Sequence, residues 1–338
     1  MSDPEFAPAE MRAFLLALFA AYGTPASHAA IVVDHLLDSS ACGLPSHGVL
    51  RVPDYLDAIE SGKVVAAVEP RVVSDSGVLV LDAQNGFGQV AAARAVSEVA
   101  ARTREHGAAV VALRRAGHLG RIGAYTEALA RDGLVAMAFC SVPTRFHNVA
   151  WFGARDGRMG TNPISYAFPT EDDPIVADFS TSATPEGRIR LLRNQGKRAP
   201  EGLLRDADGR PTTDPNVLYT PPGGTIQPLG GDFGHKGSAL GMLAEVMGTL
   251  LAEEDVGASE HENNLTLVAC TTGIGFRSRA SRYADYVHAA APIDPARPPL
   301  VPGELEVNNR RGATSISVDA TSWAAIIERA DRRDVPHP

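Results

Sequence analysis

The hydrophobic pattern changes near residue 70, and this change constrains the fold more than any other feature of the sequence. Before it, apolar residues recur at helical spacing and predict helices over residues 8–22 and 25–41, followed by a third helical piece from Ser46. Thr24 and Ser46 are expected to cap the second and third helices. Pro53 is expected to kink or restart the third helix, because its ring would clash with the carbonyl group four residues earlier.

Beyond residue 70 the pattern becomes that of a mixed α and β body. Short runs rich in apolar and β-branched residues predict strands over residues 71–75, 77–83, 108–115, 134–140, 164–169, 175–180 and 265–273. Longer stretches predict helices over residues 89–107, 121–131, 238–254 and 322–333. Because short turns join many of the strands, much of the sheet is expected to be antiparallel.

The composition narrows the class of protein. A net charge of −9 argues against general binding to nucleic acid or to an anionic membrane, because both need basic patches. Three widely spaced cysteines fit a reducing cytosol, and no CxxC or HExxH motif predicts a metal site. The apolar stretch over residues 13–23 follows an acidic flank, so we interpret it as a core-facing helix and not as a secretory signal. A cytoplasmic protein is therefore expected.

Residues 86–91, GFGQVA, match a variant of the dinucleotide-binding fingerprint between a predicted strand and a predicted helix. In that motif an acidic residue about twenty positions further on binds the ribose. Glu105 has this spacing, but it lies in the same predicted helix and not at the end of the next strand. A tight turn with close helix–strand packing is therefore the favoured interpretation, and a Rossmann dinucleotide site is the alternative.

The segment SHGVLRVPDY places potential chemistry at regular spacing, with Ser46, His47, Arg51 and Tyr55 close together. An arginine fork matches a carboxylate, and a histidine can exchange a proton at neutral pH. The alternative for this segment alone is a solvated helix face.

Three further segments carry candidate side chains. His118 lies in the glycine-rich turn GHLGRIGAY directly after a predicted strand, where functional groups often lie. Asp178, Ser180, Thr181 and Ser182 could bind ribose or phosphate. Glycines precede Lys236 at a predicted helix start, a combination that favours phosphate. Ordinary turn chemistry is the alternative for each segment.

Taken together, the motifs resemble the type-2 malate/L-lactate dehydrogenase family, also called the L-sulfolactate dehydrogenase-like family, over about residues 10–325. Eight motifs occur in the family's order: SHGVLRVPDY, LDAQNGFG, GHLGRIGAY, GTNP, DFSTSA, GRPTTDP, GHKGSALGMLAEV and PGELE. The resemblance implies an α+β fold that is not the Rossmann fold, with a helical subdomain over residues 1–70 that the chain rejoins at 305–338. Residues 71–304 would form the NAD(P)-binding and catalytic domain on a largely antiparallel sheet, in a homodimer.

The resemblance also implies roles for single residues. His47 and His118 would handle the proton, and Arg51 would bind the substrate carboxylate, with Ser46, Tyr55 and Thr161 nearby. The residues implied to contact the cofactor are Gly160, Asp178, Phe179, Ser180, Thr181, Ser182, His235, Lys236, Glu304, Leu305 and Glu306. No metal is implied.

Departures from the family pattern fall around this pocket, at Pro45, at Gly117 and Leu119, and in the stretch WFGA over residues 151–154. They leave the substrate open: a small 2-oxo or 2-hydroxy acid, or a cyclic imine-2-carboxylate. The choice between NAD and NADP is also open, with Arg145 and Arg188 as candidates for a 2′-phosphate contact. A catalytically silent relative that binds a small carboxylic acid as a sensor or scaffold is the alternative function.

Overall fold

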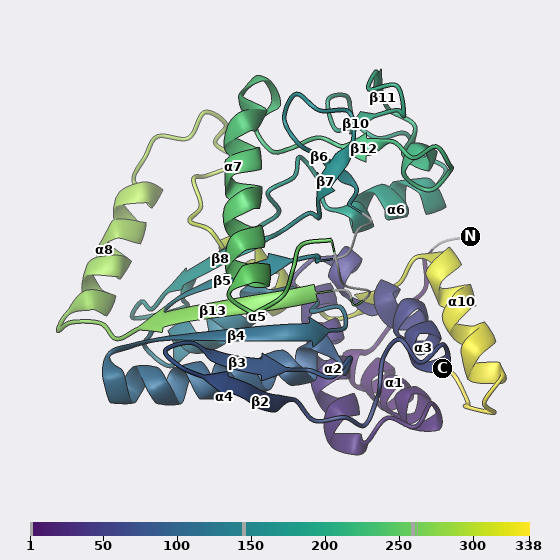
Figure 1. The fold of residues 1–338 in the computed structure, drawn as a ribbon, viewed down its shortest axis with the longest axis horizontal. Coiled ribbons are helices and arrows are strands. Elements are labelled where there is room, and N and C mark those ends of the chain that lie inside the picture. Colours follow the sequence, from purple (N-terminus) through teal and green to yellow (C-terminus); the bar gives the residue numbers. More distant parts are fainter. Residues whose placement is uncertain (1–2, 144–146, 258–260, 262) are drawn as a thin grey trace.

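A seven-stranded sheet forms the middle of the molecule, with a group of helices at one end and a small module of short strands beside it (Figure 1). The structure, a computed structural model, describes residues 3–143, 147–257, 261 and 263–338. Its helices are α1 (Pro8–Ala21), α2 (Ala26–Ala41), α3 (Val52–Glu60), α4 (Gly88–His106), α5 (Gly123–Arg131), α6 (Glu186–Asn194), α7 (Gly234–Glu245), α8 (Phe276–His288), α9 (Glu304–Gly312) and α10 (Ala320–Asp331).

The large sheet is antiparallel at every described pairing except that of β3 with β4. In spatial order its strands are β2 (Arg71–Asp75), β3 (Leu79–Asp82), β4 (Ala108–Ala116), β13 (Asn263–Cys270), β5 (Val135–Ser141), β8 (Ile164–Phe168) and β9 (Ile175–Phe179). The predicted largely antiparallel α+β fold is confirmed.

Side chains alternate across the large sheet, so each face carries its own core. Val111 and Leu113 of β4 pack with α4 and α5, whereas Ala112, between them, packs on the other face. On that other face α7 crosses the sheet, and its Ala244 packs against Phe139. Burial of both faces explains why an inner strand such as β5 is apolar at nearly every position, whereas the edge strand β2 is exposed.

The amino-terminal helices share a core with the end of the chain. In α1 the buried residues recur at helical spacing, as expected for a core-facing helix: Met11, Phe14, Leu15, Leu18 and Phe19. They cluster with Ile316 and Ile326, and β1 (Glu5–Phe6) pairs with β14 (Ile316–Ser317). The two-domain division of the chain stays a prediction.

Two expected helix caps are wrong. The second helix begins at Ala26 without a side-chain cap, and Thr24 Oγ1 is buried without a partner. Ser46 lies in a short 3-10 turn and its hydroxyl contacts His47 instead. The restart near Pro53 is confirmed, because α3 begins at Val52 and places the proline in the first turn, where its missing N–H costs nothing.

A small module, not expected from the sequence, packs around its own core of residues such as Ile189 and Leu204. Its five short strands are β11 (Pro211–Thr212), β10 (Leu204–Arg205), β12 (Thr225–Ile226), β6 (Val149–Ala150) and β7 (Gly157–Met159). Helices α6, α8 and α9 were also missed. The helix expected over 238–254 begins earlier, at Gly234, and continues beyond Glu245 as a π-helical turn to Leu250.

The fingerprint at Gly86 lies in the parallel β3–α4–β4 unit, but the start of α4 is covered by the chain. A Cβ on Gly88 would lie 2.5 Å from the carbonyl oxygens of both Gly117 and His118, and Gly117 N–H donates to Gly86 O. Phe87 and Gln89 are buried. The glycines therefore serve close backbone packing, as the favoured interpretation had it.

Replacing Gly88 by alanine is expected to lower the stability of the fold by about 1–3 kcal/mol, because the loop that carries His118 must move. Thermal unfolding measures this loss, and dinucleotide binding followed by fluorescence should stay largely unchanged. Gly273→Ala is the matched control, because a Cβ there meets nothing within 4 Å. Loss of dinucleotide affinity at unchanged melting temperature would instead favour a Rossmann site at Gly86.

Candidate active site

Two histidines from distant segments meet at one end of the large sheet. His47 lies in the turn before α3, and His118 lies in the loop between β4 and α5. Their rings are stacked with centroids 5.9 Å apart and planes 21° apart. The structure thus brings together the two side chains that were expected to exchange protons.

The Nδ1 atom of His118 is held from two sides. Gly120 N–H donates to it at 3.2 Å, and Tyr55 Oη lies 2.8 Å from it. The buried Gln89 amide donates to the same tyrosine oxygen at 2.8 Å. A backbone N–H can only donate, so we assign the proton of the neutral ring to Nε2.

Arg51 is anchored beside the histidines with its guanidinium mostly buried. Its Nε donates to Ser46 O at 2.8 Å and its Nη1 donates to Asp54 at 3.1 Å, while Nη2 lies 3.6 Å from Glu186. These partners fix the plane of the guanidinium fork, which is the geometry that carboxylate recognition needs.

Burial and positive charge keep both histidines neutral. Burial, together with the charge of Arg51, lowers the pKa of His47 to about 3. Burial and then the same arginine lower the pKa of His118 well below its ordinary value. Because Arg51 contributes to both shifts, a carboxylate bound to it would offset part of its effect.

A cavity of about 340 Å³ opens beside the histidine pair. Its walls come from the turn before α3, the His118 loop, the large sheet and the small module, and include His47, Arg51, His118, Cys140, Asn148, Gly160, Thr161, Glu186, Gly187 and Asn263. Of the predicted site residues, Gly160 and Thr161 thus join the histidines and Arg51 at one cleft. Ser46 and Tyr55 do not line this cleft but support residues that do. The main-chain carbonyl of Ser46 accepts from Arg51, and the Tyr55 hydroxyl contacts His118 Nδ1.

The serine and threonine residues of the DFSTS motif have partners within the protein. Thr181 donates from its N–H to Thr161 O at 3.0 Å and from its hydroxyl to Asn162 O at 3.0 Å. Ser180 donates to Ser182 O, and Ser182 donates to Thr184 O. This motif therefore supports Thr161, and direct contacts of its side chains with a cofactor stay a prediction.

Asp178 and Phe179 lie at the end of β9 and do not line the cleft. Asp178 accepts from Gly123 N–H at 2.7 Å, and burial raises its pKa to about 6. Phe179 is partly buried against the Phe139 cluster.

The remaining predicted cofactor contacts do not line the cleft. His235 and Lys236 lie in the first turn of α7, not before it as expected, and the ammonium group is 5.1 Å from the Phe233 ring centre. Glu304, Leu305 and Glu306 begin α9, where Glu304 pairs with His288 at 2.7 Å. Arg188 is exposed on α6, and Arg145 lies outside the described residues.

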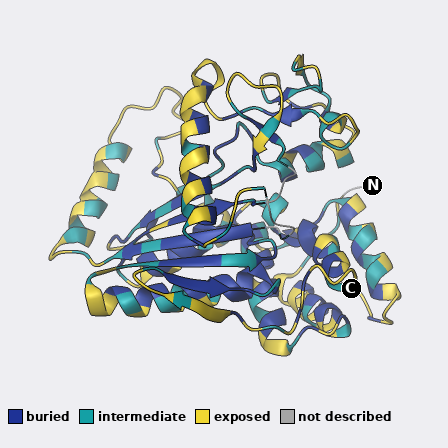
Figure 2. Ribbon diagram, in the orientation of Figure 1, coloured by how far each residue is buried: buried dark blue, intermediate teal, exposed yellow. Residues whose placement is uncertain are grey.

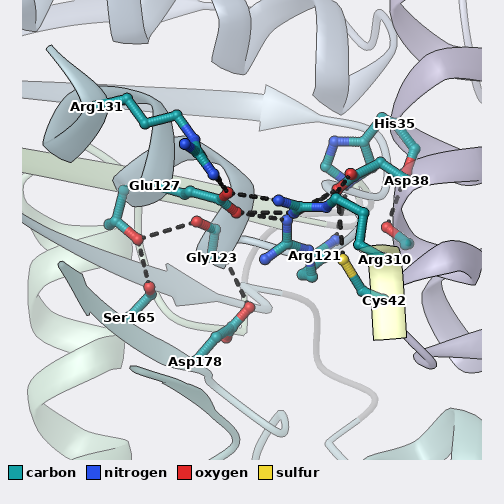
Figure 3. A network of polar contacts seen from close by, with 12 residues as sticks. His35, Asp38, Cys42, Arg121, Gly123, Glu127, Arg131, Ser165, Asp178 and Arg310 are labelled. Carbon is teal, nitrogen blue, oxygen red and sulfur yellow. Dashed lines mark hydrogen bonds and ion pairs between the residues drawn. The ribbon is translucent and has the colours of Figure 1, made fainter. Parts of the chain in front are cut away.

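The loop that carries His118 is tied down by a polar network (Figure 3). Arg121 N–H donates to His35 Nε2 at 3.0 Å, and the guanidinium of Arg121 pairs with Asp38 and Glu127. Arg310 of α9 pairs with the same two carboxylates. Burial alone would raise the pKa of Glu127, but hydrogen bonds and charge from Arg310 and Arg121 lower it to about 2. The network joins α2, α5 and α9 around the histidine loop.

Several functional candidates were missed from the sequence. Gln89 was missed because it lies within residues 86–91, which were considered only as a possible dinucleotide-binding fingerprint. Glu186 and Arg190 were missed because helix α6 was missed, although opposite charges four residues apart are a helical signal. Among the described residues, no group of three His, Cys, Asp or Glu side chains could hold a metal ion.

Over residues 6–327 the sequence matches the pattern of the malate/L-lactate dehydrogenase family. The chain belongs to that family. It is 34% identical over 354 residues to hydroxycarboxylate dehydrogenase B of Escherichia coli K12, with 99% of this chain and 96% of that protein covered. It is 38% identical over 245 residues to a Delta(1)-pyrroline-2-carboxylate/Delta(1)-piperideine-2-carboxylate reductase of Pseudomonas putida, with 72% and 69% covered.

A solved dehydrogenase structure from Sinorhizobium meliloti superposes with a TM-score of 0.89 at 28% identity, covering 97% of this chain and 98% of that one. The family inferred from the eight motifs is therefore confirmed, and its fold with it. No described helix is long and apolar enough to cross a membrane.

Proposed function

We propose that this malate/L-lactate dehydrogenase family member transfers a hydride between NAD or NADP and C2 of a carboxylic acid. The substrate would be a 2-oxo or 2-hydroxy acid or a cyclic imine-2-carboxylate. The observation that carries the proposal is the convergence of His47, His118 and the anchored Arg51 at one cleft. The relatives named as a dehydrogenase and a reductase support it.

Arg51 would bind the substrate carboxylate and orient C2 in the cleft. Two charge-assisted hydrogen bonds to a carboxylate are worth roughly 1.5–3 kcal/mol each. Because Ser46 and Asp54 fix the guanidinium, little side-chain entropy is lost on binding. A rigid anchor of this kind converts binding energy into orientation of the reacting carbon.

In reduction, C2 gains a hydride and its oxygen or nitrogen gains a proton, while NAD(P)H is oxidised to NAD(P)⁺. The Nε2–H assigned to His118 would donate to that atom as negative charge builds on it. Tyr55, whose hydroxyl lies 2.8 Å from Nδ1, would pass its own proton to Nδ1 in the same step, so that the ring stays neutral and the phenolate regains a proton from solvent. His47, whose ring lies nearly parallel to that of His118, would assist this proton transfer.

The cleft has groups that suit the nicotinamide end of a dinucleotide. Beyond the histidines it reaches Asn148, Gly160 and Asn263, whose amide and main-chain groups complement a carboxamide. Gly160 allows Val142 to pack close at this wall, because a Cβ there would lie 2.6 Å from Val142 Cγ2. When bound, the nicotinamide would supply or accept the hydride. Further contacts from the starts of α7 and α9 stay part of the proposal.

We further propose a homodimer. Figure 2 shows one face of α7 and much of α8 exposed. This face of α7 and the π-helical turn that continues it carry exposed apolar side chains at helical spacing, namely Met242, Leu243, Val246 and Leu250. A contiguous apolar stripe of this kind typically marks a protein interface. Sedimentation velocity would test the dimer, and a monomer at micromolar concentration would contradict it.

A cytoplasmic location is likewise proposed, only because the three widely spaced cysteines fit a reducing compartment.

A panel assay tests the function. Purified protein is mixed with 2-oxo acids or cyclic imine-2-carboxylates and with NADH or NADPH, and loss of the reduced-cofactor absorbance is followed. Turnover with at least one carboxylate substrate is expected, and the ratio of rates assigns the cofactor. Quenching of tryptophan fluorescence by NADH or NADPH without any turnover would instead favour the silent binder.

A further inference from the structure

Two rings contact the main chain of the His118 loop without lining the cleft, namely those of Tyr125 in α5 and His35 in α2. Tyr125 is buried, with 6% of its surface exposed. Its ring stacks on that of His35, with centroids 5.5 Å apart and planes 29° apart. The polar atoms of both side chains are directed at peptide groups of the loop, which suggests that the pair serves the residue that the loop carries.

The Tyr125 hydroxyl holds the peptide group that fixes the proton on His118. Tyr125 Oη donates to Leu119 O at 2.5 Å. The N–H of the same peptide group, on Gly120, donates to His118 Nδ1 at 3.2 Å. Because a peptide group is planar, a hydrogen bond that holds its oxygen also restricts the direction of its N–H.

His35 holds the next peptide group of the loop. Its Nε2 accepts from Arg121 N–H at 3.0 Å. Burial, and then the charge of Arg121, lower the pKa of His35 to about 4, so its ring is neutral and can accept at Nε2. Gly120 lies between the two held peptide groups with a φ of +68°, and a Cβ there would clash with His35 Nε2. The conformation of the loop therefore depends on glycine at this position and on the imidazole beside it.

Tyr55, which also contacts His118 Nδ1, does not select a tautomer. A tyrosine hydroxyl can donate to an unprotonated ring nitrogen or accept from a protonated one, so Tyr55 suits both forms of the ring. The Gly120 N–H can only donate. The tautomer of His118 therefore depends on the orientation of one peptide group.

We propose that Tyr125 and His35 are positioning residues for the proton donor: they fix the peptide groups on either side of Gly120 and thereby keep the proton of His118 on Nε2 until it is donated. This inference rests on the function proposed above, in which the Nε2–H of His118 protonates the substrate. If the peptide group turned, Nδ1 could carry the proton and donate it to Tyr55 Oη. Nε2 would then have no proton to give.

The Tyr125→Phe variant tests the inference by removing one oxygen atom. The aromatic ring stays, so its stacking on His35 and its place in the core are kept. In reduction of a 2-oxo acid, kcat should fall about tenfold while KM changes little, because Arg51, which binds the carboxylate, is untouched.

A second measurement reads the tautomer without any turnover. Proton–nitrogen NMR spectra of protein with isotope-labelled histidine report which ring nitrogen of His118 carries the proton, and the His118→Ala variant assigns the signals by their absence. Wild type should show the proton on Nε2. Tyr125→Phe should show a mixture of the two tautomers.

Tyr22→Phe is the matched control. Tyr22 is also buried, and its hydroxyl also donates to a main-chain carbonyl oxygen, that of Arg329 at 3.2 Å. This variant should lower the melting temperature about as much as Tyr125→Phe does. It should leave kcat and the NMR signals of His118 unchanged.

Two variants of His35 test the second contact. Leucine offers no acceptor for the Arg121 N–H, whereas the side-chain oxygen of glutamine can accept about where Nε2 does. His35→Leu should therefore lower kcat as Tyr125→Phe does, and His35→Gln should recover most of the loss.

A fall in kcat of Tyr125→Phe with unchanged His118 signals would overturn the inference, and so would changed signals with unchanged kcat. Equal losses of kcat in Tyr125→Phe and Tyr22→Phe would overturn it as well. If wild type turned over none of the acids with either cofactor, the proposed function would fail instead. The NMR spectra would still show whether Tyr125 and His35 fix the tautomer.

Discussion

Replacement of Arg51 by alanine is expected to lower kcat/KM for a 2-oxo acid about 10³-fold. Two charge-assisted bonds to the substrate carboxylate disappear, and the substrate also loses its orientation toward the histidines. KM should rise and kcat should fall together, because the same anchor serves binding and placement. Initial rates over a range of substrate concentrations separate the two.

Arg51→Lys provides the matched comparison, because lysine keeps the charge but loses the planar fork. It should recover only part of the activity. Arg193→Ala on α6 is the control: it removes an arginine that stacks on Tyr219 at 4.3 Å and does not line the cleft. Unchanged kinetics in Arg51→Ala, with the melting temperature preserved, would remove this residue from the site.

The alanine variant should also shift the pH profile in a defined direction. Arg51 is the largest electrostatic cause of the lowered histidine pKa values, after burial. Oxidation of a hydroxy acid needs a neutral imidazole, because an imidazolium carries a proton on both nitrogens and can accept none; wild type has the neutral ring at any pH above the lowered pKa. Without the guanidinium charge the pKa rises, so the acid limb of kcat/KM should move to higher pH.

The fold was predictable where one periodicity extended over several turns. The spacing of Met11, Phe14, Leu15 and Leu18 predicted a core-facing helix, and the structure buries all four. Short strands such as β10 and β12 have two residues each, too few for any alternation to be recognised. The small module was therefore missed, and helix α6 with it.

The candidate site was predictable in its residue types but not in its connections. His47, Arg51 and Tyr55 were expected on one stripe, yet two 3-10 turns precede α3, so they do not lie on one straight helix. Tertiary contacts bring the site residues together: the His118 loop packs on Gly88, and α6 places Glu186 against Arg51. These contacts join residues 30 positions apart for Gly88 and His118 and 135 positions apart for Arg51 and Glu186, and local spacing holds no signal for either.

Replacement of His118 by alanine is expected to lower kcat about 10²- to 10⁴-fold, because the group that donates the proton is lost. His47→Ala should lower kcat less, because among the described residues no backbone N–H donates to its ring, and the hydrogen bond of its Nδ1 is with the Ser46 hydroxyl, at 3.1 Å. Comparing the two variants therefore shows which histidine is the main proton donor. The nearly parallel arrangement of the two rings does not answer this question. Both should melt near the wild-type temperature, since both rings border the cleft.

The Tyr55→Phe variant tests the role of the tyrosine hydroxyl at Nδ1 while the imidazole ring of His118 stays in place. The imidazole keeps its Gly120 N–H donor, so the proton stays on Nε2, but the hydroxyl that compensates at Nδ1 is gone. A fall of about tenfold in kcat with little change in KM is expected, comparable to the loss of one hydrogen bond that acts in the transition state. If Tyr55→Phe changed KM and left kcat intact, the tyrosine would bind substrate directly. If His47→Ala were the more damaging histidine variant, the proton would pass through His47, and the tautomer held at His118 would serve only to position its ring.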